Sequence, residues 1–360
     1  MDRRAERFDA LRRCLLAREL DALVVASLPN IRYLTGFSGS SGLLLVTAGD
    51  VLFLSDFRYL AQAREEVGDL ARTSIENGGL WERLLRLLPE WRAVRTVGFE
   101  DHVVTSREAA KLDGQPWRFT GTGELVEELR AVKAPEEVEA IRRSGHVATA
   151  ALEAAAGHVR SGQTELEVAA LLEGALRRLG SEAYPFPTIV ASGPRTALPH
   201  AGTSTRVVAP GDLLLLDFGA VVDGYCSDVT RTFVVGAEPT DRQREVHALV
   251  ERAQRAALDG LRAGLTGRQG DALARDVIDA AGRAEAFGHS LGHGLGLEVH
   301  EAPRLARTTE EPLAASAVVT VEPGVYLEGW GGVRIEDDVV LRPAGSELLT
   351  EFPRELLRLG

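Results

Sequence analysis

The chain has 360 residues, 45% of them hydrophobic and 26% charged, and its formal net charge is −12. This length predicts two domains, or three, and supplies enough apolar material for a large core. An acidic chain without a basic run is a poor match for nucleic acid or an anionic membrane surface, so we expect neither partner. The two cysteines, Cys14 and Cys226, are too few for a disulfide framework and are typical of a reducing, cytoplasmic setting.

Residues 1–124 have the pattern of an α/β domain. The sequence contains no run of 18 apolar residues, so it predicts no membrane-spanning helix. The charged first twenty residues predict a surface helix rather than a signal peptide. Helical periodicity alternates with short β-branched runs, and Ala48-Gly49 separates the two strands of a hairpin, so we expect a mixed sheet. The expected helices are 4–19, 58–67 and 81–88, and the expected strands are 22–28, 42–47, 50–54 and 96–99.

Residues 125–360 are expected to form a second domain, which follows a linker at Thr120–Gly123. Thr164 and Glu167 form a capping-box pattern at the start of one helix. The order of helices, hairpin, helices, hairpin indicates two loosely similar halves, without a repeat that proves it. The expected helices are 136–157, 164–179, 241–263 and 270–286, and the expected strands are 212–222, 225–235, 318–322 and 333–341.

Two acids lie on the first of these hairpins. Asp217 ends the run LLLLD, and Asp223-Gly224 is a favoured two-residue turn. A hairpin closed by this turn pairs Asp217 with Thr230, and the period of two then places Asp217, Asp228 and Thr230 on one face. Two buried like charges repel unless a cation lies between them. Taken alone, the two acids could also be surface residues at strand ends.

The second hairpin repeats this pattern. Glu322 ends the strand VVTVE, and Pro323-Gly324 then interrupts the ladder. Arg334 and Glu336 are two residues apart, so they share a face of their strand. As an alternative, Glu336 and the two aspartates that follow it could form a solvated charge cluster.

Three histidines, His289, His293 and His300, lie between the hairpins in the segment HSLGHGLGLEVHEAP. Position 290 is serine and glycines fill the segment, which argues against a zinc-protease helix of the HExxH type. We expect a glycine-rich turn that lets the backbone pass close to a site. One histidine alone is more often structural, but three within twelve residues, together with four strand-borne acids, favour a functional site.

The charges of this set predict a metal centre. Four carboxylates balance two divalent cations, and one neutral histidine adds a nitrogen ligand. These donors suit manganese or zinc, and the type of ligand does not choose between them. Two-metal sites activate water and polarise carbonyl groups. A P-loop, a dinucleotide loop in its strand–loop–helix context and a GxSxG nucleophile elbow are all missing from the sequence.

The acids, the histidines and their flanks resemble the pita-bread metallopeptidases. The motifs LDFG, SDVTRT, GHGLGLEVHE, VEPGVY and RIEDD carry the resemblance, which spans residues 125–350. It implies an N-terminal creatinase/prolidase-like α/β domain at residues 1–124 and an α+β pita-bread catalytic domain at residues 125–360. It also implies two divalent metal ions, manganese first with cobalt or zinc as alternatives. The implied ligands are Asp217, Asp228, His293, Glu322 and Glu336.

Within this family the proline-directed peptidases are the most similar, because the chain carries their extra N-terminal domain. NIRYLTGFSGSSG and SDFRYLAQA resemble the Xaa-Pro aminopeptidases, which implies cleavage of the Xaa-Pro bond at the N-terminus of proline-containing peptides. The resemblance also implies a homodimer in which the N-terminal domain of one subunit caps the neighbour's site. The implied catalytic residues are His200, His300 and Glu322, and the implied substrate-binding residues are His289, Arg334 and Tyr326.

Two alternatives stay open. An Xaa-Pro dipeptidase would share the chemistry but bind the carboxylate after proline, for which an arginine fork is suited. Arg195, Arg304 and Arg334 are the candidates for this clamp. Arg334 is expected to support Glu336 or a bound carboxylate, so Arg195, which precedes His200 in SGPRTALPH, is the residue expected to turn the enzyme toward dipeptides. The other alternative is a non-catalytic peptide-binding module on the same fold, which the full set of metal ligands argues against.

Overall fold

The computed structural model describes residues 3–360, which form two compact units, and the chain passes from one to the other between Arg130 and Ala131. Helix α6 (Leu125–Arg130) belongs to the first unit. The predicted domain boundary at residue 125 stays a prediction. No helix in the described part of the chain is both long and apolar enough to cross a membrane.

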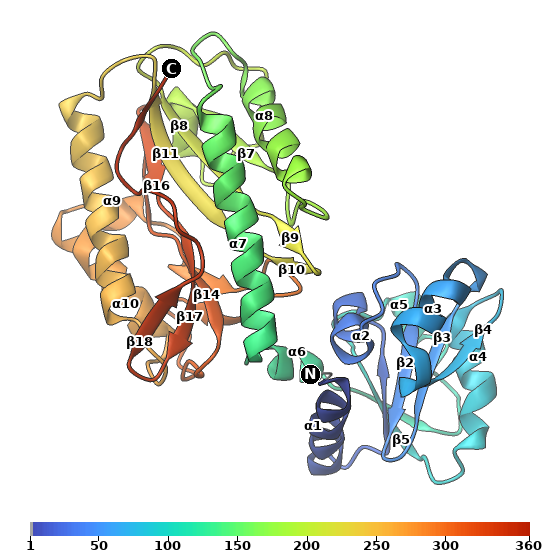
Figure 1. Cartoon of the computed structure of the whole chain (residues 1–360). Coiled ribbons are helices and arrows are strands. Elements are labelled where there is room, and N and C mark those ends of the chain that lie inside the picture. The colour runs from blue at the N-terminus through green and yellow to red at the C-terminus, as the bar shows by residue number, and fades with distance from the viewer. Residues whose placement is uncertain (1–2) are drawn as a thin grey trace. The chain divides into compact units, whose positions relative to one another are not determined.

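The N-terminal unit is built on a six-stranded mixed sheet in the order β4-β3-β2-β1-β5-β6. The pairs β1–β2 and β2–β3 are antiparallel, and the other three pairs are parallel. Helices α1 and α4 lie on opposite sides of this sheet (Figure 1). The strands are β1 (Ala22–Val25), β2 (Leu43–Thr47), β3 (Val51–Ser55), β4 (Arg72–Ile75), β5 (Thr96–Phe99) and β6 (Arg118–Gly121). The other helices are α1 (Arg4–Ala17), α2 (Leu28–Thr35), α3 (Leu60–Glu66), α4 (Leu80–Leu87) and α5 (Ser106–Ala109).

The expected hairpin around Ala48-Gly49 is confirmed, since β2 and β3 are antiparallel neighbours. The strand expected at 22–28 is too long, because it ends at Val25 and the unpredicted helix α2 begins at Leu28. Pro29 lies in the first turn of α2, where a missing backbone N–H costs nothing. Strands β4 and β6 were not predicted either.

The C-terminal unit combines a four-stranded sheet, a five-stranded sheet and two small hairpins. The sheet orders are β19-β11-β8-β7 and β13-β12-β14-β17-β18, and the hairpins are β9–β10 and β15–β16. The helices are α7 (Pro135–Ala156), α8 (Glu165–Arg178), α9 (Asp241–Gly260) and α10 (Gly267–Ala280). The first strands are β7 (Ile189–Ser192), β8 (Leu213–Phe218), β9 (Val221–Val222), β10 (Tyr225–Cys226), β11 (Val229–Val235), β12 (Gly292–Gly294) and β13 (Glu301–Leu305). The remaining strands are β14 (Val318–Val321), β15 (Gly324–Leu327), β16 (Gly331–Arg334), β17 (Asp337–Arg342), β18 (Gly345–Leu348) and β19 (Arg358–Leu359).

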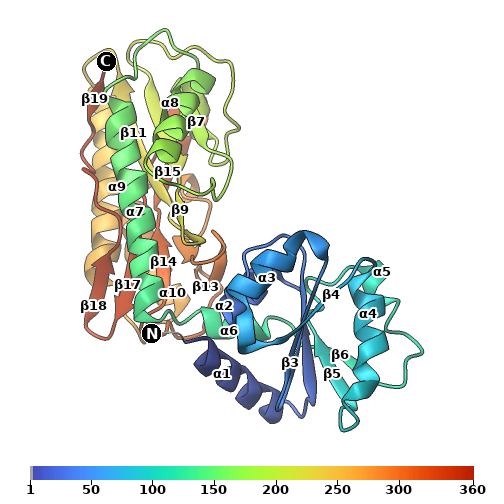
Figure 2. The same ribbon diagram turned by 45° about the vertical axis from the view of Figure 1, so that its right-hand side comes forward.

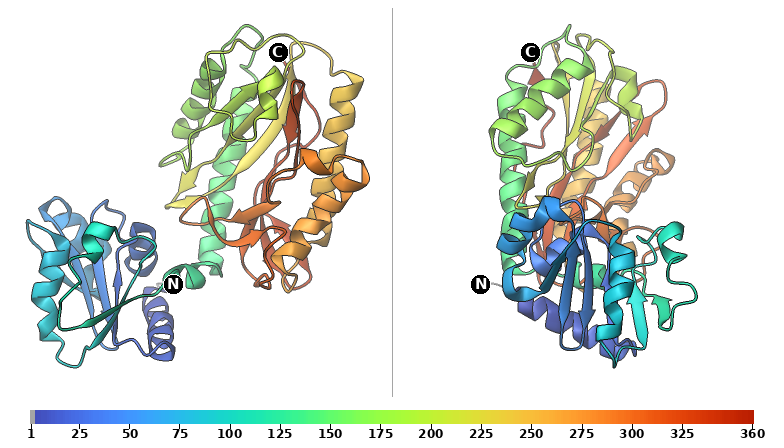
Figure 3. Two further views of the ribbon diagram at one scale, coloured as in Figure 1. Left: turned by 180° about the vertical axis from the view of Figure 1, so that it is seen from behind. Right: turned by 90° about the vertical axis from the view of Figure 1, so that its right-hand side faces the viewer.

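In this unit the strands lie between two pairs of helices. Figures 2 and 3 show α7 and α8 on one side of the strands and α9 and α10 on the other. Buried side chains of α7 and α8 pack against β8 and β11 in one core cluster. Those of α9 and α10 pack against β14, β16 and β17 in another. Each hairpin that carries predicted acids therefore packs against its own helical pair: β8 and β11 against α7 and α8, and the second hairpin against α9 and α10.

Candidate metal centre

The first hairpin has the predicted register. Asp223 and Gly224 have φ angles of +52° and +80°, as a two-residue turn of type I′ requires. Thr230 pairs with Asp217 between β11 and β8, and Asp228 directly precedes β11. Asp217 and Asp228 are both buried. The strand pairing therefore places both acids on the face that also carries Thr230.

The second hairpin is broken at its two acids. Val321 pairs with Asp337 between β14 and β17, and Gly324 pairs with Arg334 between β15 and β16. Glu322 and Glu336 occupy the gap between these ladders, opposite each other in the same register. Ile335 is fully buried in the core on the other side. The interruption predicted at Pro323-Gly324 is confirmed, and it frees both carboxylates from the regular sheet.

Thr230 joins the two hairpins. Its hydroxyl Oγ1 donates to Glu336 Oε2 at 2.5 Å, and the backbone N–H of Glu336 donates to the Thr230 carbonyl at 3.1 Å. The sequence places Thr230 beside Asp217 but gives no reason to count it as a site residue. Its partner lies 106 positions away in the chain, so only the folded structure reveals the contact.

His293 lies on β12 with its ring oriented for metal binding. Its Nδ1 is 3.0 Å from the Gly294 carbonyl, which can only accept, so Nδ1 carries the proton and Nε2 keeps its lone pair. Nε2 lies 3.5 Å from Glu322 Oε1 and 3.8 Å from Asp228 Oδ2. Burial lowers the pKa of His293 to about 4, so the ring is neutral near pH 7, as a ligand must be.

The structure brings the five predicted ligands together unequally. Asp228, His293 and Glu336 form the tightest group, with one donor atom from each within 4.8 Å of the others. Glu322 joins this group through His293. Asp217 lies outside the tight group and pairs with Arg334. The pKa of Asp228 is raised by burial first, then by the charge of Glu336 and then by the charge of Asp217. Asp217 therefore lies near Asp228.

The donor set fits divalent cations. Burial first, and the charge of Glu336 second, raise the pKa of Asp228 and Glu322 well above the usual values. Burial and the charge of Asp217 likewise raise the pKa of Glu336 to about 8. Asp228 Oδ1 is buried without a hydrogen-bond partner among the described residues. Cations between these oxygens would relieve the repulsion and satisfy that atom, and carboxylates with one imidazole suit such ions.

Arg334 contacts Asp217 rather than Glu336. Its Nη2 donates to Asp217 Oδ2, and its Nη1 donates to Tyr326 Oη at 2.7 Å. Its Nε donates to Thr230 Oγ1 at 3.1 Å. The support that the sequence suggested for Glu336 is therefore indirect, through Thr230.

His289 and Tyr326 extend this chain of contacts. His289 Nδ1 is 2.8 Å from the Ser290 carbonyl, so Nδ1 carries the proton. Nε2 therefore accepts from Tyr326 Oη at 2.9 Å, and Tyr326 accepts from Arg334 in turn. Burial raises the pKa of Tyr326 to about 12 and keeps its hydroxyl protonated. In the structure these two predicted substrate-binding residues orient each other and Arg334.

The two predicted catalytic histidines lie at the edge of the centre. His300 directly precedes β13, and its ring centroid is 4.3 Å from that of His293, outside the tight ligand group. Burial, then the charge of Arg304, then His200 lower the pKa of His300, so His200 lies close to it. His200 itself is exposed on the segment that follows β7.

Two of the three candidate arginine clamps have partners inside the fold. Arg334 is bound to Asp217, as described. Arg195 Nε lies 3.2 Å from both carboxylate oxygens of Glu165, and its Nη2 donates to the Gly202 carbonyl. Arg304 is exposed, and its guanidinium makes no hydrogen bond or ion pair with the described residues. It pairs with His293 across β12–β13, which places both side chains on one face.

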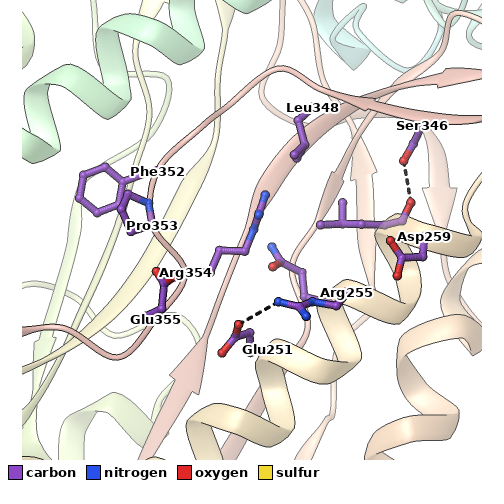
Figure 4. Close-up of a pocket in the computed structure, with 11 residues that line it drawn as sticks. Glu251, Arg255, Asp259, Ser346, Leu348, Phe352, Pro353, Arg354 and Glu355 are labelled. Atoms are coloured by element: carbon purple, nitrogen blue, oxygen red, sulfur yellow. Dashed lines mark hydrogen bonds and ion pairs between the residues drawn. The ribbon is translucent and has the colours of Figure 1, made fainter.

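A surface hollow of about 450 Å³ lies elsewhere in the C-terminal unit (Figure 4). Glu251 and Arg255 of α9 form one part of its wall, and Phe352 to Glu355 form another. None of the predicted site residues lines it. Because it shares no lining residue with the metal centre, the hollow is a separate feature. Arg354 of its wall forms an ion pair at 2.7 Å with Asp337, which follows Glu336 in the chain.

Comparison with known proteins agrees with this geometry. Residues 139–343 match metallopeptidase family M24, and residues 7–132 match the creatinase/prolidase N-terminal domain. A solved Xaa-Pro dipeptidase from Bacillus anthracis is 38% identical, with a TM-score of 0.95 over 99% of this chain and 100% of that chain. An X-Pro aminopeptidase from Thermotoga maritima is also 38% identical, with a TM-score of 0.90 over 98% of this chain and 99% of that one. The Xaa-Pro dipeptidase of Pyrococcus furiosus is 35% identical over 98% of this chain and 99% of its own length.

These matches confirm the predicted fold class, an α/β N-terminal domain with a mixed sheet followed by an α+β pita-bread domain. Both matched regions together cover most of the chain, and the solved relatives cover nearly all of it. The chain therefore belongs to metallopeptidase family M24 and is a metal-dependent hydrolase.

Proposed function

We propose that this protein is an Xaa-Pro aminopeptidase with two divalent metal ions, most readily manganese, with cobalt or zinc as alternatives. The observation that carries the proposal is the buried group of Asp228, His293 and Glu336, with Glu322 in contact and Asp217 nearby. Relatives named Xaa-Pro dipeptidase and X-Pro aminopeptidase support the choice of an Xaa-Pro bond.

The bound metals would activate water and polarise the carbonyl before proline. Glu322 faces His293 with Oε1, and its side chain is largely buried but not sealed from solvent. It would carry a proton to the prolyl nitrogen as the bond breaks. The Xaa-Pro nitrogen has no N–H, so the site must accept the ring and cannot recognise this position by a hydrogen bond from a backbone amide.

His200 and His300 would donate hydrogen bonds to the oxygen of the tetrahedral intermediate. His300 lies beside His293 without belonging to the tight ligand group, and His200 lies close to His300. His289 and Tyr326 would shape the pocket through their contacts with Arg334. In the same proposal the protein works in the cytoplasm as a homodimer, with the N-terminal domain of one subunit covering the other's site.

The second candidate is an Xaa-Pro dipeptidase, and one observation favours it. Arg304 is exposed and without an ion-pair partner in the described chain, on the same face of the ladder as His293. A guanidinium in this place can bind the carboxylate of a dipeptide in a bidentate fork. Longer peptides lack a carboxylate directly after proline and would gain nothing from it.

Substrate length decides between the two. The protein is treated with a chelator, reloaded with manganese and assayed for kcat/KM with Ala-Pro-Ala and Ala-Pro. The aminopeptidase proposal expects the tripeptide to be cleaved at least as efficiently as the dipeptide. A dipeptide preference of about tenfold or more, removed by Arg304→Met but not by the exposed control Arg307→Met, would make the protein a dipeptidase. Bound metal without turnover of either peptide would indicate a non-catalytic binding module.

A further inference from the structure

Glu165 is a fully buried carboxylate that the metal centre does not use. It lies in the first turn of α8. Its Oε1 accepts from the N and Oγ of Ser192, at 2.9 and 2.8 Å. Its Oε2 accepts from the N and Oγ of Ser204, at 3.0 and 2.6 Å. Arg195 Nε lies 3.2 Å from both oxygens. One side chain thus joins two positions twelve residues apart.

Between these positions runs the segment 193–203, here called the His200 loop. It starts with a short 3₁₀ helix, Gly193–Ala197, and continues to Thr203 with His200 exposed near its middle. Arg195 Nη2 donates to the Gly202 carbonyl, which draws the two arms of the loop together. Glu165 therefore fixes the base of the loop at both ends, and Arg195 links the arms above it.

The middle of the loop is held by the metal centre itself. Arg334 Nη1 donates to the Pro199 carbonyl at 3.2 Å, one residue before His200. The backbone N–H of Gly332, on the same strand as Arg334, donates to Thr196 Oγ1 at 2.8 Å. His200 is thus placed by contacts on one side to β16 and on the other to Glu165 and Arg195.

We propose that Glu165 is a positioning residue that holds His200 beside the metal centre. The inference rests on the proposed catalytic role of His200. A glutamine at position 165 has the same size, but its amide nitrogen would face the N–H and O–H donors of one serine, and the charge that Arg195 contacts would be lost. The loop would then lose one of its two fastened ends while the metal ligands stay in place.

The test compares Glu165→Gln with Glu167→Gln in the manganese-loaded protein. Glu167 lies in the same helical turn, is exposed and closes the capping box with Thr164, a role that glutamine also fills. We expect Glu165→Gln to lower kcat by about 10- to 100-fold, as a misplaced catalytic group does, with unchanged metal content. The control variant should keep the kcat and the metal content of the unaltered protein.

A double-mutant cycle with His200→Ala shows whether Glu165 acts through His200. If it does, Glu165→Gln has little further effect on kcat in the His200→Ala protein. Additive losses would mean that Glu165 acts elsewhere, and they would overturn the proposal. Hydrogen exchange of the amides at 197–203 gives a readout that does not depend on activity, and we expect faster exchange in Glu165→Gln.

Two outcomes separate this proposal from the proposed function. If His200→Ala keeps full kcat, the catalytic role of His200 fails, and positioning of His200 for catalysis fails with it. If His200→Ala lowers kcat but Glu165→Gln leaves both kcat and loop exchange unchanged, only the role of Glu165 is overturned. Should Glu165→Gln fail to fold, Ser204→Ala removes the 2.6 Å bond to Glu165 Oε2 and the 3.1 Å bond that Ser204 Oγ accepts from the Arg206 N–H, and it keeps the Glu165 carboxylate. It is then expected to give a smaller change of the same kind, and unchanged exchange and kcat would overturn the proposal.

Discussion

Lys133 and Glu301 form a buried ion pair between residues 168 positions apart, with 2.6 Å between Lys133 Nζ and Glu301 Oε1. Their side chains are 1% and 4% exposed. Lys133 lies two residues before α7, and its N–H also donates to the Ser316 carbonyl. Glu301 follows His300 directly at the start of β13. The pair therefore ties the beginning of the C-terminal unit to the strand beside the metal centre.

Removing one partner of this pair should destabilise the protein strongly. Lys133→Met leaves the Glu301 carboxylate buried without its cation, and breaking such a pair costs about 3–5 kcal/mol. The free energy of unfolding from denaturant titration checks this. Arg268→Met, which breaks the exposed pair with Glu310 at 3.0 Å, is the control and should cost about 1 kcal/mol or less. Equal losses in the two variants would contradict the prediction.

Loss of Asp228 should remove metal. Asp228 belongs to the tight ligand group, and its Oδ1 has no other partner in the described chain. We expect Asp228→Ala to lose at least one bound ion, measured by elemental analysis after loading with manganese. Asp259→Ala, at an exposed position on α9, serves as the control. Two ions still bound per chain in Asp228→Ala would show that the ligand assignment is wrong.

The sequence predicted the hairpin geometry because the information is local. The turn Asp223-Gly224 and the period of two fix the register of β8 and β11, so the shared face of Asp217 and Asp228 follows from neighbouring residues. The break at Pro323 is local as well, since proline cannot donate to a ladder.

Contacts between distant segments could not be predicted in this way. Nothing near Arg334 indicates that its partner is Asp217, 117 positions earlier. The capping-box pattern with Thr164 identifies the role of Glu167, which is exposed, but nothing in the sequence indicates that Glu165 is buried under the His200 loop. Whether an acid in the first turn of a helix is buried depends on what packs against that helix, and propensity carries no information about that.

The segment around His293 shows a different limit. Its glycines suggested a turn, whereas the structure has the short strand β12 between β13 and β14. A Cβ at Gly292 would lie 2.0 Å from the Thr320 carbonyl oxygen, and one at Gly294 would lie 2.1 Å from that of Ala302. Glycine is needed at these positions because the neighbouring strands approach so closely. From the sequence alone, glycines that serve close strand packing cannot be told from glycines that form a turn.

His300 should matter for turnover and not for metal binding. Its ring packs 4.3 Å from that of His293 but lies outside the tight ligand group. We expect His300→Ala to lower kcat roughly 10²–10³-fold, the usual effect of losing one hydrogen-bond donor to the oxyanion, with metal content retained. His146→Ala, exposed on α7, is the matched control. Parallel losses of metal and activity would make His300 a ligand.

His247 should make stability depend on pH. It is buried on α9, and burial first, then the charge of Arg231, lower its pKa from 6.5 to about 4, with Glu355 opposing. The unfolded chain therefore takes up this proton near pH 6.5, while the folded chain does not until about pH 4. The stability from a neutral His247 is complete above pH 6.5 and is lost as the pH falls from there toward 4.

The expected size of this effect is about 2 kcal/mol of unfolding free energy between pH 7 and pH 5, from the two pKa values. Denaturant titrations at both pH values should show this decrease in the unaltered protein beyond the decrease in His247→Leu, which has no titrating ring. His158→Leu, at an exposed position after α7, should keep the full pH dependence. Apart from the ring that each variant lacks, all three proteins have the same titrating groups, so the contributions of those groups cancel in the comparison. If His247→Leu loses as much stability on acidification as the unaltered protein, the folded chain accepts the proton on His247 without penalty, and burial is not what makes the folded state sensitive to acid.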